Sequence, residues 1–292
     1  MTTPADVPGR AVRPSLRALY FVPLMLACGY LALLLLLFAG GTAAYFAWTV
    51  RSPLTAATLG ASYASGVALF AVGLRLRRWV DVRIVAYTSL AQLVLMLGVA
   101  VLHHDRLHLT EGEVGGFLGA WGFVAVHAVM PVVGLVLLAV QSRAPGGDPP
   151  RSGPADLFTG VPIAWVALVG CGLGAAMLAV PGALSGVWPW PVTDLDLRAL
   201  GVWTLTFGLG SLWALREGDP ERMRAGAAGY AAVGAFSLLA VLTHPGAMDW
   251  GSAFAWLYVL GMLGLVGMGL VGLALAGPAE RWPGNGSLTM EA

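Results

Sequence analysis

Histidine is the residue type in this sequence whose spacing most suggests chemistry. The phrase VLHH at 101–104 returns as VLTH at 241–244, and His108 follows His104 by one helical turn. Neutral imidazole is a common ligand of zinc and of haem iron. A metal site would draw on the set His103, His104, His108 and His244. Ligation of one haem by two histidines would need only His104 and His244, so a haem or a divalent metal is one candidate cofactor.

The same histidines have a simpler interpretation as the ends of helices. A histidine in the last turn of a helix bonds the free carbonyl groups there, and Pro245-Gly246 is typical of a helix end. Neither an HExxH nor a CxxCH motif accompanies them. We therefore favour helix termination over metal or haem binding for the VLxH phrase.

His127 stands apart from this group, in the middle of the apolar run 114–142. An ionisable residue inside a membrane span is a functional candidate by default. The alternative is a neutral histidine that is hydrogen-bonded to a neighbouring helix. We favour this alternative because the sequence offers no second ionisable group at that depth.

The second half of the chain contains a loop in which tryptophans and acids alternate, with Trp188, Trp190, Asp194 and Asp196 close together and Asp249 further on. Gathered at the outer face, the three acids would form a polar pocket for an interfacial membrane enzyme. A loop anchored by tryptophans at the membrane interface is the favoured alternative. Since no nucleophile elbow or Walker loop is present, the sequence favours a non-enzymatic protein.

The elements that position these residues are predicted from composition. The chain of 292 residues is 58% hydrophobic and 11% charged, against about 25% charged residues in soluble domains. Each uncharged run can hold one helix of about 20 residues across a bilayer, where the backbone must bond to itself. The run 199–215 is short, and its helix is expected to begin near Leu195. The runs are 18–50, 52–74, 84–104, 114–142, 157–193, 199–215, 225–248 and 250–279.

The arginines predict the orientation of these eight spans. With a cytoplasmic N-terminus, all but three of the sixteen basic residues fall on the cytoplasmic side, which is a strong positive-inside signal. The three outer arginines are Arg51, Arg106 and Arg198. We expect a bacterial inner-membrane protein with both termini in the cytoplasm. A net charge of +1 argues against binding of nucleic acid.

Matched phrases in the same order indicate a tandem duplication. Two stretches of the chain, 1–141 and 157–292, are predicted to be four-helix membrane repeats, and 142–156 is a Pro- and Gly-rich cytoplasmic linker. The fold class is therefore all-α, with two parallel four-helix units related by an axis along the membrane normal. The matched pairs are Cys28 with Cys171, Trp48 with Trp190, Thr55 with Thr193, Leu59 with Leu200, Arg75 with Arg216, His104 with His244 and Trp121 with Trp256.

The segment WPWPVTDLDLRALGVW, together with LHHDRLH in the other half, resembles a family of uncharacterised multi-pass membrane proteins of high-GC, actinobacterial-type bacteria that carry a WPW-x-x-T motif. The residues that carry the resemblance are Trp188, Pro189, Trp190, Thr193, Arg198, Gly201, His104, Asp105 and Arg106. The resemblance implies the membrane architecture and no activity.

These observations predict a non-enzymatic binding, transport-like or complex-forming membrane scaffold that contacts the lipid bilayer and is suited to a membrane-protein partner. Every Asp, Glu and Arg falls in a loop or at a helix end, which argues against an ion pump or a proton-coupled antiporter. A pathway for a neutral or amphipathic solute between the halves stays open. The alternatives are the haem or metal protein and the interfacial enzyme.

Overall fold

The protein was analysed as a computed structural model that describes residues 9–110, 112–151 and 157–277. Its long helices are α2 (Val22–Leu37), α3 (Pro53–Gly73), α4 (Trp79–Leu102), α5 (Val114–Ser142), α6 (Leu157–Ala179), α8 (Asp194–Glu217), α9 (Arg224–Thr243) and α10 (Ala253–Leu275). The shorter elements are α1 (Pro14–Leu16), η2 (Arg17–Phe21), η3 (Ala39–Ala44), η4 (His104–Arg106), α7 (Pro181–Ser185), η5 (Pro220–Met223) and η6 (Pro245–Ala247). The predicted all-α class is confirmed, and part of the predicted linker, 152–156, lies outside the described residues.

Local sequence accounts for where several helices begin and end. Proline occupies the first turn of α3, where its missing N–H costs nothing. Thr193 and Asp196 form a reciprocal capping box that starts α8, close to the predicted Leu195. Gly218 ends α8 in the left-handed conformation, with a φ of 58° that glycine adopts without strain.

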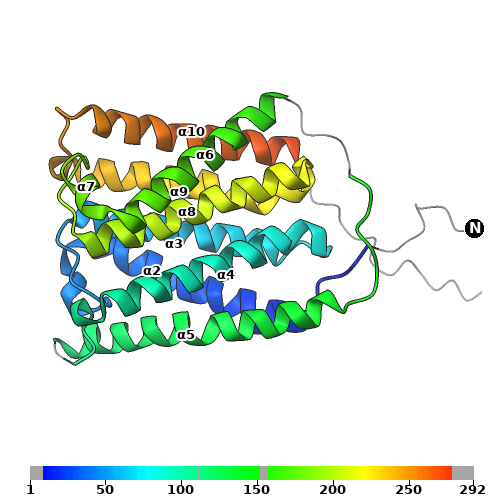
Figure 1. The fold of residues 1–292 in the computed structure, drawn as a ribbon, viewed down its shortest axis with the longest axis horizontal. Coiled ribbons are helices and arrows are strands. Elements are labelled where there is room, and N and C mark those ends of the chain that lie inside the picture. The colour runs from blue at the N-terminus through cyan, green and yellow to red at the C-terminus, as the bar shows by residue number, and fades with distance from the viewer. Residues whose placement is uncertain (1–8, 111, 152–156, 278–292) are drawn as a thin grey trace, which may run out of the picture.

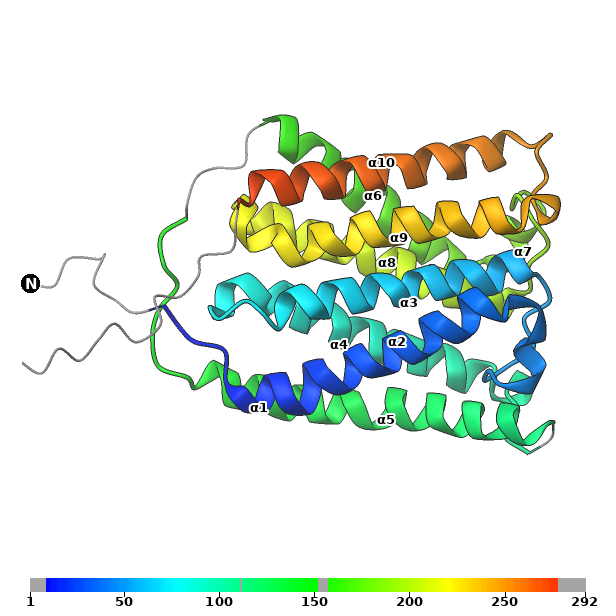
Figure 2. The same ribbon diagram turned by 180° about the vertical axis from the view of Figure 1, so that it is seen from behind.

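The helices run lengthwise between two ends of the molecule (Figure 1). We call the end that carries His103, His104, His108 and His244 the histidine end. The opposite end, which carries Arg17, Arg78, Arg83, Arg143, Arg216 and Arg222, is the arginine end. The helices α2 and α6 both start at the arginine end, and the chain passes from α5 to α6 there (Figures 1 and 2).

The long helices form two facing layers of four. One layer has the order α2, α3, α9, α10, and the other has the order α5, α4, α8, α6, with neighbours in each order packed together. Figure 1 shows the second layer nearer the viewer, and Figure 2 shows the first. Each layer therefore combines a pair of consecutive helices from before the α5–α6 connection with a pair from after it. The helices α2 to α5 therefore lie on one side of the molecule and α6 to α10 on the other, and they meet mainly where α3 packs on α9 and α4 packs on α8 (Figure 1).

In the described part of the chain, seven helical segments are long and apolar enough to cross a membrane. The share of each span that is buried inside the protein falls from 72% in α3 to 6% in α10. The helices at the edges of the layers therefore expose their apolar side chains outward. This pattern is that of a multi-pass helical membrane protein. The helix α8 is not among the seven, because it carries charged residues at both ends and polar residues between them. It lies between α4 and α6 and buries much of its surface against protein.

Two buried tryptophans join the layers at the histidine end. The indole N–H of Trp48, just before α3, donates to Oδ1 of Asp196 on α8 over 3.0 Å. The indole N–H of Trp190, just before α8, donates to the hydroxyl oxygen of Thr55 on α3 over 2.8 Å. Trp48 is 3% exposed and Trp190 is 2% exposed, so neither side chain faces the membrane interface. This differs from the expected role of Trp190 as an interfacial anchor.

A cluster of ion pairs joins the elements at the arginine end. The buried carboxylate of Glu217, at the end of α8, accepts hydrogen bonds from Arg83 of α4 and from Arg222 of η5. Arg83 also pairs with Asp148 in the segment after α5, with 2.6 Å between Nη1 and Oδ2. A buried carboxylate with two guanidinium partners is well compensated. The cluster therefore positions α4, α8 and the start of α9 relative to one another.

We predict that the two tryptophan hydrogen bonds stabilise the fold measurably. Trp190→Phe should lower the free energy of unfolding by about 1 kcal/mol, and Trp48→Phe by about 2 kcal/mol because its acceptor is a carboxylate. Thermal unfolding in mild detergent measures both effects. The matched control is Trp203→Phe, which removes the same ring area from a buried indole whose Nε1 has no partner among the described residues. Equal losses in all three variants would contradict the prediction.

Candidate functional site

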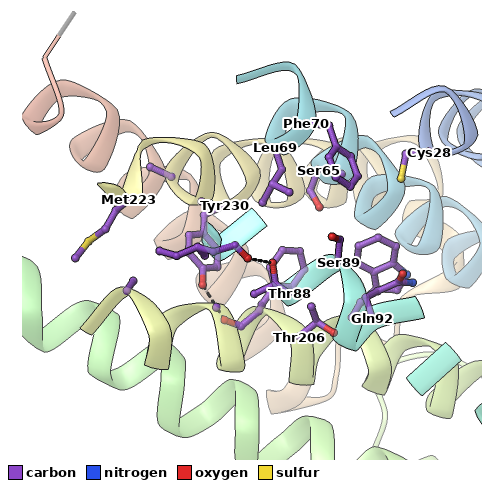
Figure 3. A pocket seen from close by; sticks show the side chains of 18 of the residues that line it. Cys28, Ser65, Leu69, Phe70, Thr88, Ser89, Gln92, Thr206, Met223 and Tyr230 are labelled. Atoms are coloured by element: carbon purple, nitrogen blue, oxygen red, sulfur yellow. Dashed lines mark hydrogen bonds between the residues drawn. The ribbon is translucent and has the colours of Figure 1, made fainter. Parts of the chain in front are cut away.

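A cavity of about 120 Å³ lies between the two layers. Figure 3 shows side chains that enclose it from both layers. Most of the lining is aliphatic or aromatic, and the polar members are Ser65, Thr88, Ser89, Gln92, Trp203, Thr206 and Tyr230. Mostly apolar walls with a few polar groups are typical of sites for small molecules.

The hydroxyl groups of this cavity already donate to protein atoms. Ser65 donates to the carbonyl oxygen of Ser62 over 2.6 Å, and Thr206 donates to that of Val202 over 2.7 Å. The Tyr230 hydroxyl donates to the carbonyl oxygen of Phe207 over 2.8 Å. Bonds of this kind satisfy a hydroxyl within or beside its own helix. These side chains give the cavity some polarity, but their hydroxyl groups have no hydrogen left to donate to a ligand.

Two N–H groups of the lining differ from the hydroxyls. Nε2 of Gln92 on α4 and Nε1 of Trp203 on α8 are buried and have no hydrogen-bond partner among the described residues. The two side chains are only 7% and 8% exposed. A buried donor without an acceptor costs about 1–3 kcal/mol. Both donors come from the same layer, and both belong to residues that line the cavity.

The chemistry of this cavity is that of neutral binding. Among the described residues that line it, none carries a charge. An ionised ligand would therefore lose its hydration without a counter-charge, which is costly in an apolar environment. A neutral molecule with oxygen atoms that accept hydrogen bonds would satisfy Gln92 and Trp203 and would fit the apolar walls.

A second cavity, of about 550 Å³, lies at the histidine end. It is lined by Trp48, Thr49, Arg51, His103, Arg106, Thr193, Asp194 and Leu195. Nε2 of His103 accepts a hydrogen bond from Nη1 of Arg198 over 2.9 Å, which requires an unprotonated Nε2. Burial, and then the charge of Arg198, lower the pKa of His103. His103 is thus held as a neutral imidazole with an arginine as its neighbour.

The other histidines of the repeated phrase lie at helix ends. Nδ1 of His104 contacts the carbonyl oxygen of Val101, and Nδ1 of His244 contacts that of Ala240, each over 3.2 Å. These are the contacts that helix termination predicts. His103 and His244 are the C-cap residues of α4 and α9, so the position of His244 corresponds to His103 and not to His104.

His108 is held in a different way from the histidines at the helix ends. Its Nδ1 contacts the carbonyl oxygen of Phe46, and its Nε2 contacts the hydroxyl of Thr49, each over 3.0 Å. In the described part of the chain, no three His, Cys, Asp or Glu side chains are grouped to hold a metal ion. The metal and haem interpretations stay predictions, which metal analysis and a visible spectrum would test.

His127 lies inside α5 and is 3% exposed. Its Nδ1 donates to the carbonyl oxygen of Phe123 over 2.7 Å, and the two rings pack 4.2 Å apart. The bonding partner is therefore one turn back in the same helix, and not on a neighbouring helix as the sequence suggested. His127 does not line either of the two cavities described above.

The acids of the predicted outer loop are divided among separate roles. Asp196 is buried and accepts from Trp48 and Thr193, so it holds structure in place. Asp194 lines the second cavity, and Oδ1 of Asp249 accepts from the backbone N–H of Gly251. Trp188 packs 5.3 Å from Trp190, ring centre to ring centre.

The sequence analysis did not single out Gln92 and Trp203. A signal for Gln92 was present, because it is an amide in the middle of the uncharged run 84–104. Trp203 carried no such signal, since its position among other tryptophans is explained equally well by packing. Comparison of the chain with protein-family models, curated proteins and solved structures finds no match.

We predict that Gln92→Leu makes the ligand-free protein more stable. The substitution removes a buried donor without an acceptor and keeps a similar volume, so it should raise the free energy of unfolding by about 1 kcal/mol. The control is Gln141→Leu, because the fully buried Gln141 amide accepts from the N–H of Arg13 and donates to the carbonyl oxygen of Ala11. That variant should be less stable than the wild type. A loss of stability in both variants, measured by thermal unfolding, would contradict the prediction.

Proposed function

We propose that this membrane protein binds a small neutral molecule in the cavity between its two layers, as a non-enzymatic binding or transport-like protein. The observation that carries the proposal is the pair of buried donors without acceptors, Gln92 Nε2 and Trp203 Nε1. Proteins rarely leave such groups unpaired. A ligand that supplies the acceptors would offset this cost on binding.

The uncharged lining supports a neutral ligand, and the apolar walls support a predominantly apolar one. Asp196 is buried in structural hydrogen bonds, and the histidines lie at helix ends. These structural roles weaken the interfacial-enzyme alternative. A complex with another membrane protein is compatible with the proposal, since the edge helices α6 and α10 expose apolar side chains.

We further propose that α8 crosses the membrane together with the seven apolar segments, which gives eight spans in two parallel repeats. Three features support the repeat. The Trp48 and Trp190 bonds are reciprocal between the halves. The sulfur of Cys28 lies 2.8 Å from where a Cβ on Gly66 would be, and the sulfur of Cys171 lies 2.8 Å from where a Cβ on Gly208 would be. The ends of α4 and α9 are alike, each with a histidine at the C-cap followed by a short 3₁₀ turn.

We also propose a bacterial inner membrane as the location, with the arginine end in the cytoplasm. All but three of the arginines support this orientation by the positive-inside rule. The resemblance of the WPW-x-x-T segment to uncharacterised membrane proteins of high-GC bacteria supports the same location and adds no activity.

Gly226→Leu tests the proposed function. Gly226 lines the cavity, and a Cβ on it would have no neighbour within 4 Å, so a leucine side chain can fill the space without a clash. The protein is purified from its native membranes in mild detergent. Neutral small molecules are then extracted from the purified protein and quantified by mass spectrometry. We expect a retained molecule in the wild type and at least a tenfold loss of it in Gly226→Leu.

The matched control is Gly267→Leu on α10, which also has open space around it but does not line the cavity. Gly267→Leu brings the same gain in helix propensity as Gly226→Leu. The Gly267→Leu protein should nevertheless retain the molecule. The proposal fails when the wild type retains no neutral molecule, or when all three proteins retain it equally.

A further inference from the structure

The two edges where the layers meet are closed to different degrees. At one edge, α1 and η2 contact α5. Tyr20 of η2 is fully buried, and its ring lies so close to Gly134 of α5 that a Cβ there would be 2.8 Å from it. Its hydroxyl lies 3.3 Å from the hydroxyl of Ser89, which lines the cavity. Tyr20 therefore closes this edge.

The opposite edge lies between α6 and α10. These two helices are not among the pairs that pack closely in the described residues. Behind them, α8 and α9 are joined by Tyr230, whose hydroxyl donates to the carbonyl oxygen of Phe207. The cavity nevertheless reaches both edge helices, because Ile163 of α6 and Met268 and Gly272 of α10 line it. All three are only partly buried. We call this opening, defined by Ile163, Met268 and Gly272, the α6–α10 edge.

We infer that the α6–α10 edge is a lateral entrance from the bilayer, and that the ligand is a neutral single-tailed lipid with a small head that carries acceptor oxygens. This inference rests on the proposed function and specifies its substrate class. The two helices of this edge expose apolar side chains outward, including Trp165 of α6 and Leu270 and Val271 of α10. A solute from water would have to cross this apolar surface, whereas a lipid already resides beside it.

The size of the cavity sets the size of the head. Its volume of about 120 Å³ is slightly below that of an engineered cavity of about 150 Å³ that binds benzene. A head about as large as one six-membered ring fits, and a whole lipid does not. The tail must therefore leave through the α6–α10 edge and remain in the bilayer.

The free donors set the chemistry of the head. Gln92 and Trp203 line the cavity, and each carries an N–H without a partner among the described residues, so we expect a head with two acceptor oxygens to pair with both. Because no described lining residue is charged, a carboxylate or phosphate head is disfavoured. The entrance lies nearer the arginine end, since Ile163 is early in α6 and Gly272 is late in α10.

Three probes with the same tail test the chemistry. Decyl-benzoquinone has two carbonyl acceptors, decylbenzene has the same shape without them, and decanoate carries a charge. Binding of each to the full chain in detergent is measured by titration calorimetry. We expect decyl-benzoquinone to bind at least tenfold more tightly than the other two. Gln92→Leu and Trp203→Phe should each weaken quinone binding about tenfold and leave decylbenzene unchanged.

Ile163→Trp tests the entrance. A tryptophan at the α6–α10 edge should slow both association and dissociation of decyl-benzoquinone by tenfold or more, in stopped-flow measurements on the protein in lipid nanodiscs. Leu168→Trp on the same helix is the control, because Leu168 is 68% exposed and does not line the cavity. Met268→Trp on α10 repeats the test if Ile163→Trp does not fold.

The outcomes separate this inference from the proposed function. Equal affinities for decyl-benzoquinone and decylbenzene would overturn the head chemistry, and unchanged rates in both tryptophan variants would overturn the lateral entrance. Either result can coexist with a neutral molecule that Gly226→Leu displaces, in which case the proposed function stands. When the wild type binds no probe and retains no neutral molecule, both proposals fail.

Discussion

The two indole hydrogen bonds that cross between the layers are the constraint on which the rest of this structure depends. Each tryptophan precedes the central helix of its own layer and donates into the first turn of the central helix in the other. The starts of α3 and α8 are therefore held at one relative height. At the arginine end, the Glu217 cluster holds α4, α8 and η5 in the same way. Between these two ends, the layers meet at fewer points, such as the hydrogen bond from the Tyr230 hydroxyl to Phe207 and the packing of Tyr63 on Trp203.

The cavity lies where the two layers contact each other less closely. Contacts within each layer are extensive, whereas contacts between layers involve mainly the central helices. Interiors are normally packed as densely as organic crystals, so a persistent space between layers is unusual. Here its walls carry two unpaired donors, Gln92 and Trp203, which an efficient core would exclude. Such a cavity is destabilising when it is empty. A bound ligand is the simplest explanation for it.

A reciprocal architecture does not require identical edges. Tyr20 fills the space between η2 and α5, whereas at the other edge the cavity reaches α6 and α10 at Ile163, Met268 and Gly272. Under the repeat that we propose, one edge keeps an aromatic side chain where the other admits a ligand. The difference in side-chain size converts a symmetric framework into a site with one entrance.

The sequence by itself determined the membrane class, the helical content and some of the helix boundaries. Uncharged runs such as 114–142 match α5 residue for residue, because a bilayer requires about 20 apolar residues per helix and expels charge. The VLxH phrases predicted helix ends, since histidine can bond the last carbonyl groups there. These are local properties, and local sequence decides them.

Only the tertiary structure decided which helices meet. Nothing in the pattern around Trp48 indicates that its partner is Asp196, because hydrogen bonds between distant segments leave no periodic signal in a sequence. Packing between the two halves placed Trp190 in the interior against Thr55 and not at the membrane interface. Gln92 and Trp203 became a candidate site only when folding left their N–H groups without acceptors. Apolar composition specifies that helices associate in a membrane, and side-chain geometry specifies where they fail to fill the space between them.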